Sequence, residues 1–251
     1  MPTWNPEQYL KFAEERSRPC HDLAARVEVA APRRIIDLGC GPGNSAEVLS
    51  ARWPNAAITG IDTSAAMIDA ARAASPQCEW RIGDIEGWAA GDERFDVVFS
   101  NAALQWVGDH AAVFPRLLAR VVTGGALAVQ VPGNYTSAQH QLMRKVGTRF
   151  HLQVREWHTH DLDFYYDALA PHASRLDLWA TEYLHVLPDV EAIVEWYKGT
   201  GMRPYLDALA SEADRERFLA EYLEGLRTIF RPQPDGAVLF PFRRLFVVAY
   251  R

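Results

Sequence analysis

A glycine-rich turn near residue 40 is the stretch of this sequence best suited to chemistry. Residues 35–43 read I-I-D-L-G-C-G-P-G, with glycines at every second position from Gly39 to Gly43. Glycines let backbone N–H groups approach a ligand closely, and a helix that starts after them directs its positive end at the same ligand. The apolar positions in residues 44–53 predict that helix. A strand, this turn and a helix together indicate a nucleoside-binding turn in a Rossmann-like sheet.

The spacing of these glycines argues against a dinucleotide. A dinucleotide turn reads G-x-G-x-x-G, whereas here the pattern is G-x-G-x-G and Asn44 stands where the third dinucleotide glycine would lie. Asp37 precedes the first glycine by two residues, and a carboxylate there would repel a pyrophosphate but suit a cation. S-adenosylmethionine carries a sulfonium and an ammonium and no phosphate. The pattern D-x-G-x-G-x-G resembles the first motif of the class I S-adenosylmethionine-dependent methyltransferases.

A second acid follows at the distance expected for a nucleoside site. Asp62 ends the predicted strand 56–62, nineteen residues after Gly43. Nucleotide-binding sheets place an acid there that accepts both ribose hydroxyls. Asp62 has an alternative role as a helix cap, but Ser64 can itself cap the predicted helix 65–74. The pattern therefore favours a ribose-binding role for Asp62.

Two further strand ends add to the predicted site. The resemblance implies that Asp84, after the predicted strand 78–82, accepts from the adenine amine while the Ile85 N–H meets a ring nitrogen. The predicted strand 95–101 is followed by N-A-A-L, where methyltransferases acting on DNA, glutamine or adenine nitrogen have Asn/Asp-Pro-Pro-aromatic. Methylation of amides or bases is therefore disfavoured. The candidate cofactor-binding residues are Asp37, Gly39, Cys40, Gly41, Gly43, Asp62, Thr63, Met67, Asp84, Ile85, Asn101, Ala102, Trp106 and Arg16.

Composition limits the partners. The chain has 251 residues, 49% of them hydrophobic, so it can bury a large core. Its formal net charge is −6, and its Lys and Arg residues form no basic stripe that would bind nucleic acid or an anionic membrane. Its three cysteines are far apart, which argues against a zinc site and a disulfide framework and for the cytoplasm. No apolar leader or membrane-length apolar run is visible. We expect no metal, no nucleic acid and no membrane partner.

The order of predicted elements indicates an α/β fold of one methyltransferase domain. An N-terminal helical segment, 1–30, reads as two helices that begin at Asn5 and break at R-S-R-P, 16–19. The cofactor-binding core covers 31–131 and ends with a helix over 110–121 and a strand over 126–131. Insertions at about 132–175 and 189–235 predict a helical lid, and closing strands cover 177–187 and 237–251, the latter in two pieces. We expect a seven-stranded, mostly parallel sheet with helices on both faces.

Several local strings resemble a narrower family, the trans-aconitate 2-methyltransferases. The strings are W-N-P-E-Q-Y-L-K-F at 4–12, R-S-R-P at 16–19, N-A-A-L-Q-W-V at 101–107, W-Y-K-G-T-G-M-R-P-Y at 196–205 and L-F-P-F-R-R-L-F-V-V-A at 239–249. They span both ends of the chain and the predicted lid. The resemblance implies methyl transfer from S-adenosylmethionine to a carboxylate of trans-aconitate, which gives a monomethyl ester.

Such a reaction makes few demands on catalytic side chains. A carboxylate is ionised at neutral pH because its reference pKa is about 4, so no general base is required. A tricarboxylate does need cations to bind it, and planar guanidinium groups suit it best. The candidate substrate-binding residues are Arg203, Arg18, Trp106 and Tyr205, with Arg16 as a further cation. Arg231, Arg243 and Arg244 are weaker candidates, because basic residues near a last strand are usually solvated, and no histidine is assigned a role.

Other functions remain open from the sequence alone. The same pattern fits an O-, N- or C-methyltransferase for another small molecule, or a cofactor-binding module without catalysis. A nicotinamide-dependent oxidoreductase is disfavoured by the glycine spacing and by Asp37. The sequence does not indicate which carboxylate is methylated or how related acids are treated. No heptad pattern predicts an assembly, so we expect a monomer.

Overall fold

A computed structural model describes residues 12–154 and 159–251 of the chain. The chain divides into two compact units. Of the described residues, the sheet unit contains 14–133, 159–181 and 244–251, and the helical unit contains 12–13, 134–154 and 182–243. Two long strands, β6 (Arg175–Leu187) and β7 (Val238–Tyr250), belong partly to each unit. The helix predicted to begin at Asn5 lies outside the described residues.

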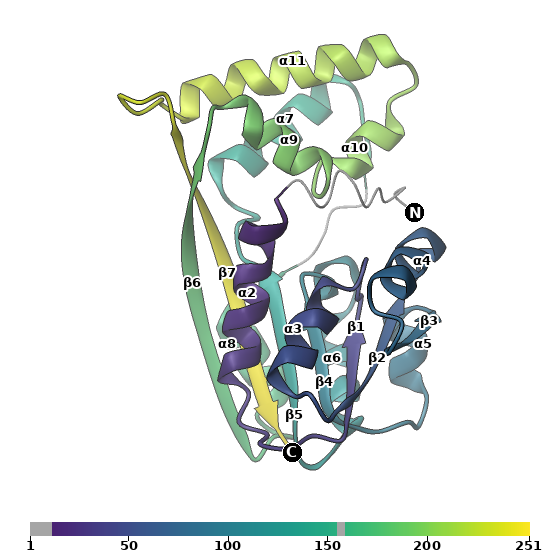
Figure 1. The fold of residues 1–251 in the computed structure, drawn as a ribbon. Coiled ribbons are helices and arrows are strands. Elements are labelled where there is room, and N and C mark those ends of the chain that lie inside the picture. Colours follow the sequence, from purple (N-terminus) through teal and green to yellow (C-terminus); the bar gives the residue numbers. More distant parts are fainter. Residues whose placement is uncertain (1–11, 155–158) are drawn as a thin grey trace. The chain divides into compact units, whose positions relative to one another are not determined.

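The sheet has the predicted seven strands in the order β3-β2-β1-β4-β5-β7-β6 (Figure 1). Strands β1 to β4 pair in parallel, β5 pairs in parallel with β4, and β7 is antiparallel to β5. The predicted seven-stranded, mostly parallel, Rossmann-like sheet is therefore confirmed. The strands are β1 (Arg34–Leu38), β2 (Ala57–Asp62), β3 (Glu79–Ile82), β4 (Phe95–Asn101), β5 (Val121–Pro132), β6 (Arg175–Leu187) and β7 (Val238–Tyr250).

Alternation along each strand gives the sheet two differently covered faces. One face carries Ile36, Val98 and Val129 and joins Phe114 and Tyr165 of two helices in a single apolar core. The other face carries Asp37, whose register partner is Phe99. The helices of the sheet unit are α2 (Ala13–Arg26), α3 (Asn44–Arg52), α4 (Ala65–Ala74), α5 (Ile85–Ala90), the 3-10 turn η1 (Leu104–Trp106), α6 (His110–Ala119) and α8 (Leu162–Leu169).

The predicted helix break at R-S-R-P is wrong, because α2 runs through Pro19 without interruption. Proline removes one backbone hydrogen bond in a helix interior. Cys20, Leu23 and Ala24 lie beyond it and are at most 2% exposed. Burial of this apolar side explains why the helix continues, since packing routinely outweighs local propensity.

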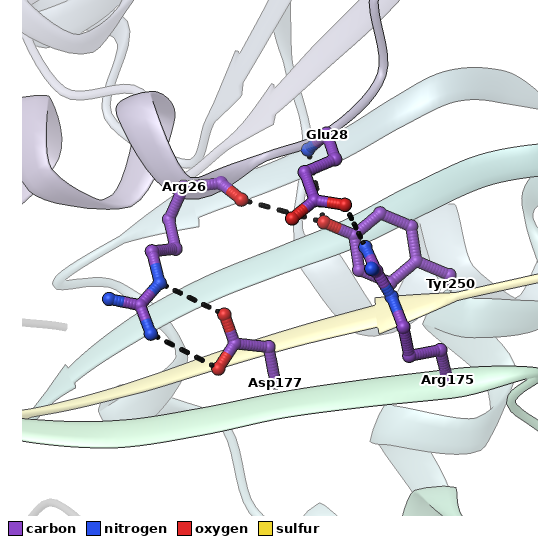
Figure 2. Close-up of polar contacts among 5 residues, drawn as sticks. All are labelled: Arg26, Glu28, Arg175, Asp177 and Tyr250. Atoms are coloured by element: carbon purple, nitrogen blue, oxygen red, sulfur yellow. Dashed lines mark hydrogen bonds and ion pairs between the residues drawn. The ribbon is translucent and has the colours of Figure 1, made fainter.

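Figure 2 shows how the C-terminal end of α2 is attached to the last strands. The Arg26 guanidinium donates to Asp177 at 3.0 Å, and Arg175 donates to Glu28 at 2.7 Å. The Glu28 backbone N–H donates to the Tyr250 hydroxyl at 3.0 Å. These bonds join a segment before β1 to strands β6 and β7, and they fix the helix against the sheet face that carries Asp37.

The helical unit contains a separate apolar core. Trp196, Tyr197, Phe218, Tyr222 and Phe240 are all at most 1% exposed and pack together. The long helical stretch predicted over 189–230 is divided by two turns. The helices are α7 (Ala138–Arg149), α9 (Glu191–Lys198), α10 (Arg203–Ala208) and α11 (Glu212–Ile229).

Two details of the predicted insertions differ from the structure. The closing strand β7 is one continuous strand and includes Pro241. Its ladder with β5 covers only residues 244–250, so the missing N–H of Pro241 costs no bond to β5. Helix α8, which falls in the first predicted insertion, belongs to the sheet unit, where Tyr165 and Leu169 join the apolar core. Among the described residues, no helix combines the length and apolar character needed to cross a membrane.

Candidate functional site

The glycine turn after β1 is shaped by left-handed backbone at Gly39 and Gly41, with φ angles of 73° and 54°. A Cβ placed on Gly39 would lie 2.2 Å from Cβ of Ala103, so the turn after β1 packs directly on the turn after β4. A Cβ placed on Gly41 would have no heavy atom within 4 Å. Gly39 is therefore needed for packing, whereas Gly41 borders open space. Cys40 between them is buried, and Gly43 precedes the first residue of α3.

Asp62 lies beside this turn at the end of β2. Its Oδ2 accepts the Gly41 N–H at 3.0 Å, and its Oδ1 accepts the Ser64 N–H at 2.9 Å. The Ser64 hydroxyl in turn accepts from the Met67 N–H, so Ser64 caps α4 as predicted. Burial raises the pKa of Asp62, and the N–H donors of Ser64 and Gly41 oppose that shift. Thr63 is exposed next to it.

The end of β3 contributes Asp84 and Ile85. Asp84 is the N-cap of α5, and its Oδ1 accepts the Gly87 N–H at 2.7 Å. The Ile85 Cδ1 atom is 3.8 Å from the Cβ position of Gly39. The structure therefore brings the end of β3 next to the glycine turn, as the predicted site requires.

The turn after β4 is held by its own hydrogen bonds. Ser100 Oγ donates to the Leu38 carbonyl at 2.8 Å, and Gln105 Nε2 donates to the Ala102 carbonyl at 2.7 Å. Ala102 has a φ of 56°, an uncommon conformation for a non-glycine residue. Trp106 ends the following 3-10 turn and is half-buried. Asn101 is the last residue of β4.

Asp37 is the most unusual side chain of the site. It is fully buried, and neither carboxyl oxygen has a hydrogen-bond partner in the described part of the chain. Burial, and then the nearby charge of Asp62, raise its pKa to about 8. A buried carboxyl without a partner is costly. A cationic ligand would remove that cost, whereas a phosphate would increase it.

Sequence reasoning missed Gln130. This side chain is on β5, is fully buried, and has no hydrogen-bond partner for either amide atom among the residues described. Its register partner is Asn101, whose Oδ1 is also buried without a partner in that part of the structure. The available signal was a glutamine inside the apolar run A-L-A-V-Q-V. That run predicts a fully buried strand, in which an amide is out of place.

The predicted substrate residues are divided between the units. Arg18 is exposed on α2, and nothing is described of the Arg16 side chain. Arg203 begins α10 and lies 3.7 Å from Asp207. The Tyr205 ring stacks on Phe218 with centroids 5.8 Å apart, so it is a core residue of the helical unit.

One of the arginines expected to be solvated is not. Arg244 is only 6% exposed, whereas Arg243 beside it is exposed. Alternation along β7 turns Arg243 outward and Arg244 inward. Arg244 therefore joins the list of candidate cations.

Comparisons with known proteins identify the family and the fold. Residues 35–125 match the family model described as a methyltransferase domain. The chain is 47% identical to trans-aconitate 2-methyltransferase of Azoarcus sp. (strain BH72) and 46% identical to that of Rhodopseudomonas palustris (strain BisB5), with full coverage of both chains in each case.

Solved structures with low sequence identity share the fold. The YcgJ protein of Bacillus subtilis has a TM-score of 0.63 at 13% identity and covers 92% of this chain and 97% of its own. Phosphoethanolamine N-methyltransferase 2 of Haemonchus contortus, in complex with S-adenosyl-L-methionine, has a TM-score of 0.58 at 15% identity. The match covers 92% of this chain and 52% of that protein's chain. The full-length relatives decide the narrower assignment. The chain belongs to the trans-aconitate 2-methyltransferase family.

Proposed function

We propose that this protein transfers a methyl group from S-adenosylmethionine to a carboxylate of trans-aconitate, giving the monomethyl ester and S-adenosylhomocysteine. Membership of the family supports the substrate. The observation that supports S-adenosylmethionine as the cofactor is the position of Asp37 beside a glycine turn. Its carboxyl group is fully buried and has no hydrogen-bond partner among the described residues. That pairing suits a nucleoside which carries positive charge and no phosphate.

The residues of the sheet unit fit this cofactor. Gly41 leaves open space at the turn, and Asp62 is held in place by two backbone N–H groups, so its remaining lone pairs suit ribose hydroxyls. Asp84 and Ile85 follow β3, the strand next to β2, on the side where an adenine would lie. The order of strands therefore matches the order of groups along the nucleoside.

Catalysis in this proposal rests on alignment and on exclusion of water. When bound, the cofactor supplies an electrophilic methyl group on a sulfonium. The reacting carboxylate is already ionised at neutral pH, because its reference pKa is about 4, so no side chain has to remove a proton. The protein holds the carboxylate oxygen in line with the methyl group and keeps the pocket dry.

The direct test is methyl transfer from labelled S-adenosylmethionine to trans-aconitate. We expect an ester product with this acid and much less product with phenols, amines and other small acids. Transfer to a phenol or an amine instead would assign another small-molecule methyltransferase. Cofactor binding without transfer to any compound of the panel would indicate a non-catalytic module. We further propose that the protein acts as a cytoplasmic monomer on this small tricarboxylate.

Replacing Asp62 with alanine is expected to weaken S-adenosylmethionine binding. The change removes a charged acceptor for ribose hydroxyls, which costs about 1.5–3 kcal/mol, or about ten- to a hundredfold in the dissociation constant. Calorimetric titration of the folded variant measures it. Asp69→Ala, an exposed acid on α4, is the control and should leave the affinity unchanged. Unchanged affinity in Asp62→Ala would exclude a ribose-binding role.

Cofactor affinity is expected to rise with pH between about pH 6 and 7.5, because Asp37 must ionise to pair with a cation. Its pKa of about 8 leaves it mostly protonated at the lower pH. The dissociation constant should fall by about twentyfold across this interval, which lies below the reference pKa of an α-amino group, about 7.7–8.0, so most of the ligand's ammonium is still protonated. Calorimetry at several pH values tests this, and Asp37→Asn should remove the dependence. A flat profile in the wild-type protein would show that the ligand does not meet this carboxyl.

A further inference from the structure

Three polar side chains with buried atoms that lack a hydrogen-bond partner among the described residues share one face of the sheet. Asp37 on β1 is the register partner of Phe99 on β4, and Asn101 lies two residues further along β4. Asn101 is in turn the register partner of Gln130 on β5. Side chains that are in register, or two residues apart on one strand, point to the same face. Asp37, Asn101 and Gln130 therefore form a polar row on neighbouring strands.

This polar row ends abruptly beyond Gln130. The next residue in register is Phe246 on β7, which stacks on Trp179 of β6 with centroids 4.7 Å apart and planes 3° apart. One step further along β7 on the same face is the buried Arg244, the register partner of Pro132. A fully buried amide, a buried arginine and an aromatic pair thus lie on neighbouring strands of one face near the carboxyl end of β5.

The buried amide of Gln130 indicates a ligand. Burying a carboxamide without hydrogen bonds costs free energy that replacement by an apolar side chain of the same shape would recover. The two amide atoms of Gln130 and the Oδ1 of Asn101 all lack partners within the described residues. Of these atoms, only the Gln130 Nε2 donates hydrogen bonds, so it is the one suited to an anionic group.

The order of strands places Gln130 on the acceptor side of the reaction. The candidate adenine, ribose and turn contacts follow β3, β2 and β1, and β4 and β5 come next. Two strand spacings, about 10 Å, separate β1 from β5. If the nucleoside extends from β3 toward β1, the molecule that receives the methyl group lies at β4 and β5.

We propose that the Gln130 amide binds the reacting carboxylate of trans-aconitate, with Nε2–H donating to one oxygen while the other oxygen forms the bond to the methyl carbon. The bond between sulfur and that carbon breaks, and its electron pair stays on sulfur. A neutral donor holds the carboxylate without the charge neutralisation that a guanidinium would impose. Arg244, one step further along the same face, is placed for a second carboxylate of the substrate.

This inference rests on the proposed function, and one pair of variants tests it. Gln130→Met keeps the length of the side chain but removes the amide. We expect kcat/KM for trans-aconitate to fall at least about tenfold, with the dissociation constant of S-adenosylmethionine changed less than about twofold. The melting temperature of the ligand-free protein should not fall, because the change removes a buried amide that has no hydrogen-bond partner within the described residues. Gln77→Met, an exposed glutamine of the sheet unit, is the control and should change nothing.

A readout that does not depend on turnover comes from NMR of the ¹⁵N-labelled glutamine side chains. The Gln130 signal is identified by its loss in Gln130→Met or in Gln130→Glu, so one folded variant suffices. With S-adenosylhomocysteine already bound, the signal should shift when trans-aconitate is added. A shift on S-adenosylhomocysteine alone, with none on adding the acid, would overturn the proposal in favour of the cofactor.

The remaining outcomes separate this inference from the proposed function. If the wild-type protein transfers methyl to trans-aconitate but Gln130→Met keeps its kcat/KM, the function stands and the role of Gln130 is wrong. A lower melting temperature with unchanged kcat/KM would show that the amide is structural. If the wild-type protein neither methylates trans-aconitate nor shows the NMR shift on its addition, both proposals fail.

Discussion

Replacing Gly41 with valine is expected to abolish S-adenosylmethionine binding while the sheet unit remains folded. The glycine has a φ of 54° and borders open space, so a new side chain meets no protein atoms but projects toward the ligand. A β-branched residue also disfavours this left-handed backbone and would shift the N–H that Asp62 accepts. We expect the dissociation constant to rise more than about a hundredfold.

The matched control for this change is Gly124→Val. Gly124 also has a left-handed backbone, with a φ of 82°, and no heavy atom near its Cβ position. It lies in β5 near the opposite end of that strand from Gln130. Both changes place a β-branched residue at a left-handed backbone position, so thermal melting should show a loss of stability in both variants, and circular dichroism should show both folded. Only Gly41→Val should lose binding in calorimetry, and retained binding would place the ligand elsewhere.

Arg203→Ala is expected to lower kcat/KM for trans-aconitate about thirty- to a thousandfold. This corresponds to a loss of about 2–4 kcal/mol in transition-state stabilisation. Arg203 opens α10, directly before Pro204, and its side chain is 21% exposed. A guanidinium held at the start of a short helix suits a carboxylate that is not being methylated. Arg203→Lys keeps the charge but loses the planar fork, so a smaller loss is expected. S-adenosylmethionine affinity should barely change in either variant.

Two further variants separate binding from structure at this position. Arg203 lies 3.7 Å from Asp207, and an ion pair of this kind contributes little to stability. If the arginine serves only that pair, Asp207→Asn should reproduce the effect of Arg203→Ala. Arg217→Ala removes an exposed arginine of α11 and should leave kcat/KM for trans-aconitate unchanged. A kcat/KM within about twofold of wild type in Arg203→Ala would show that Arg203 does not bind the substrate. The candidate cations would then be Arg16, Arg18 and Arg244.

Much of the sheet unit could be predicted because its signals are local. The helix over 65–74 and the strand over 95–101 have the predicted limits. The positions of Asp62 and Asp84 after strands β2 and β3 could be predicted because parallel strands bring their carboxyl ends to one edge, so a strand-end acid already has an expected place. The glycine turn was found because its backbone requirement is visible in the residue types themselves.

The remaining features depend on tertiary contacts that a local pattern does not contain. Pro19 interrupts a local helix pattern, yet burial of the neighbouring face decides that the helix continues. Arg244 reads as a surface residue until pairing between β7 and β5 turns it inward. Gln130 reads as one polar residue in a strand, and its importance depends on the absence of any hydrogen-bonding partner among the described residues.

The attachment of α2 shown in Figure 2 also bears on how the protein is made. Glu28 and Tyr250, which share a hydrogen bond, are 222 residues apart in sequence, and Arg26 and Asp177 are 151 apart. During synthesis, a nascent chain that has emerged only to residue 243 has α2 and β5 but lacks the segment of β7 that pairs with β5. The edge of β5 stays open to other chains in that interval. Contacts this far apart in sequence slow folding, and this edge of β5 is covered only after the last residues of the chain have been made.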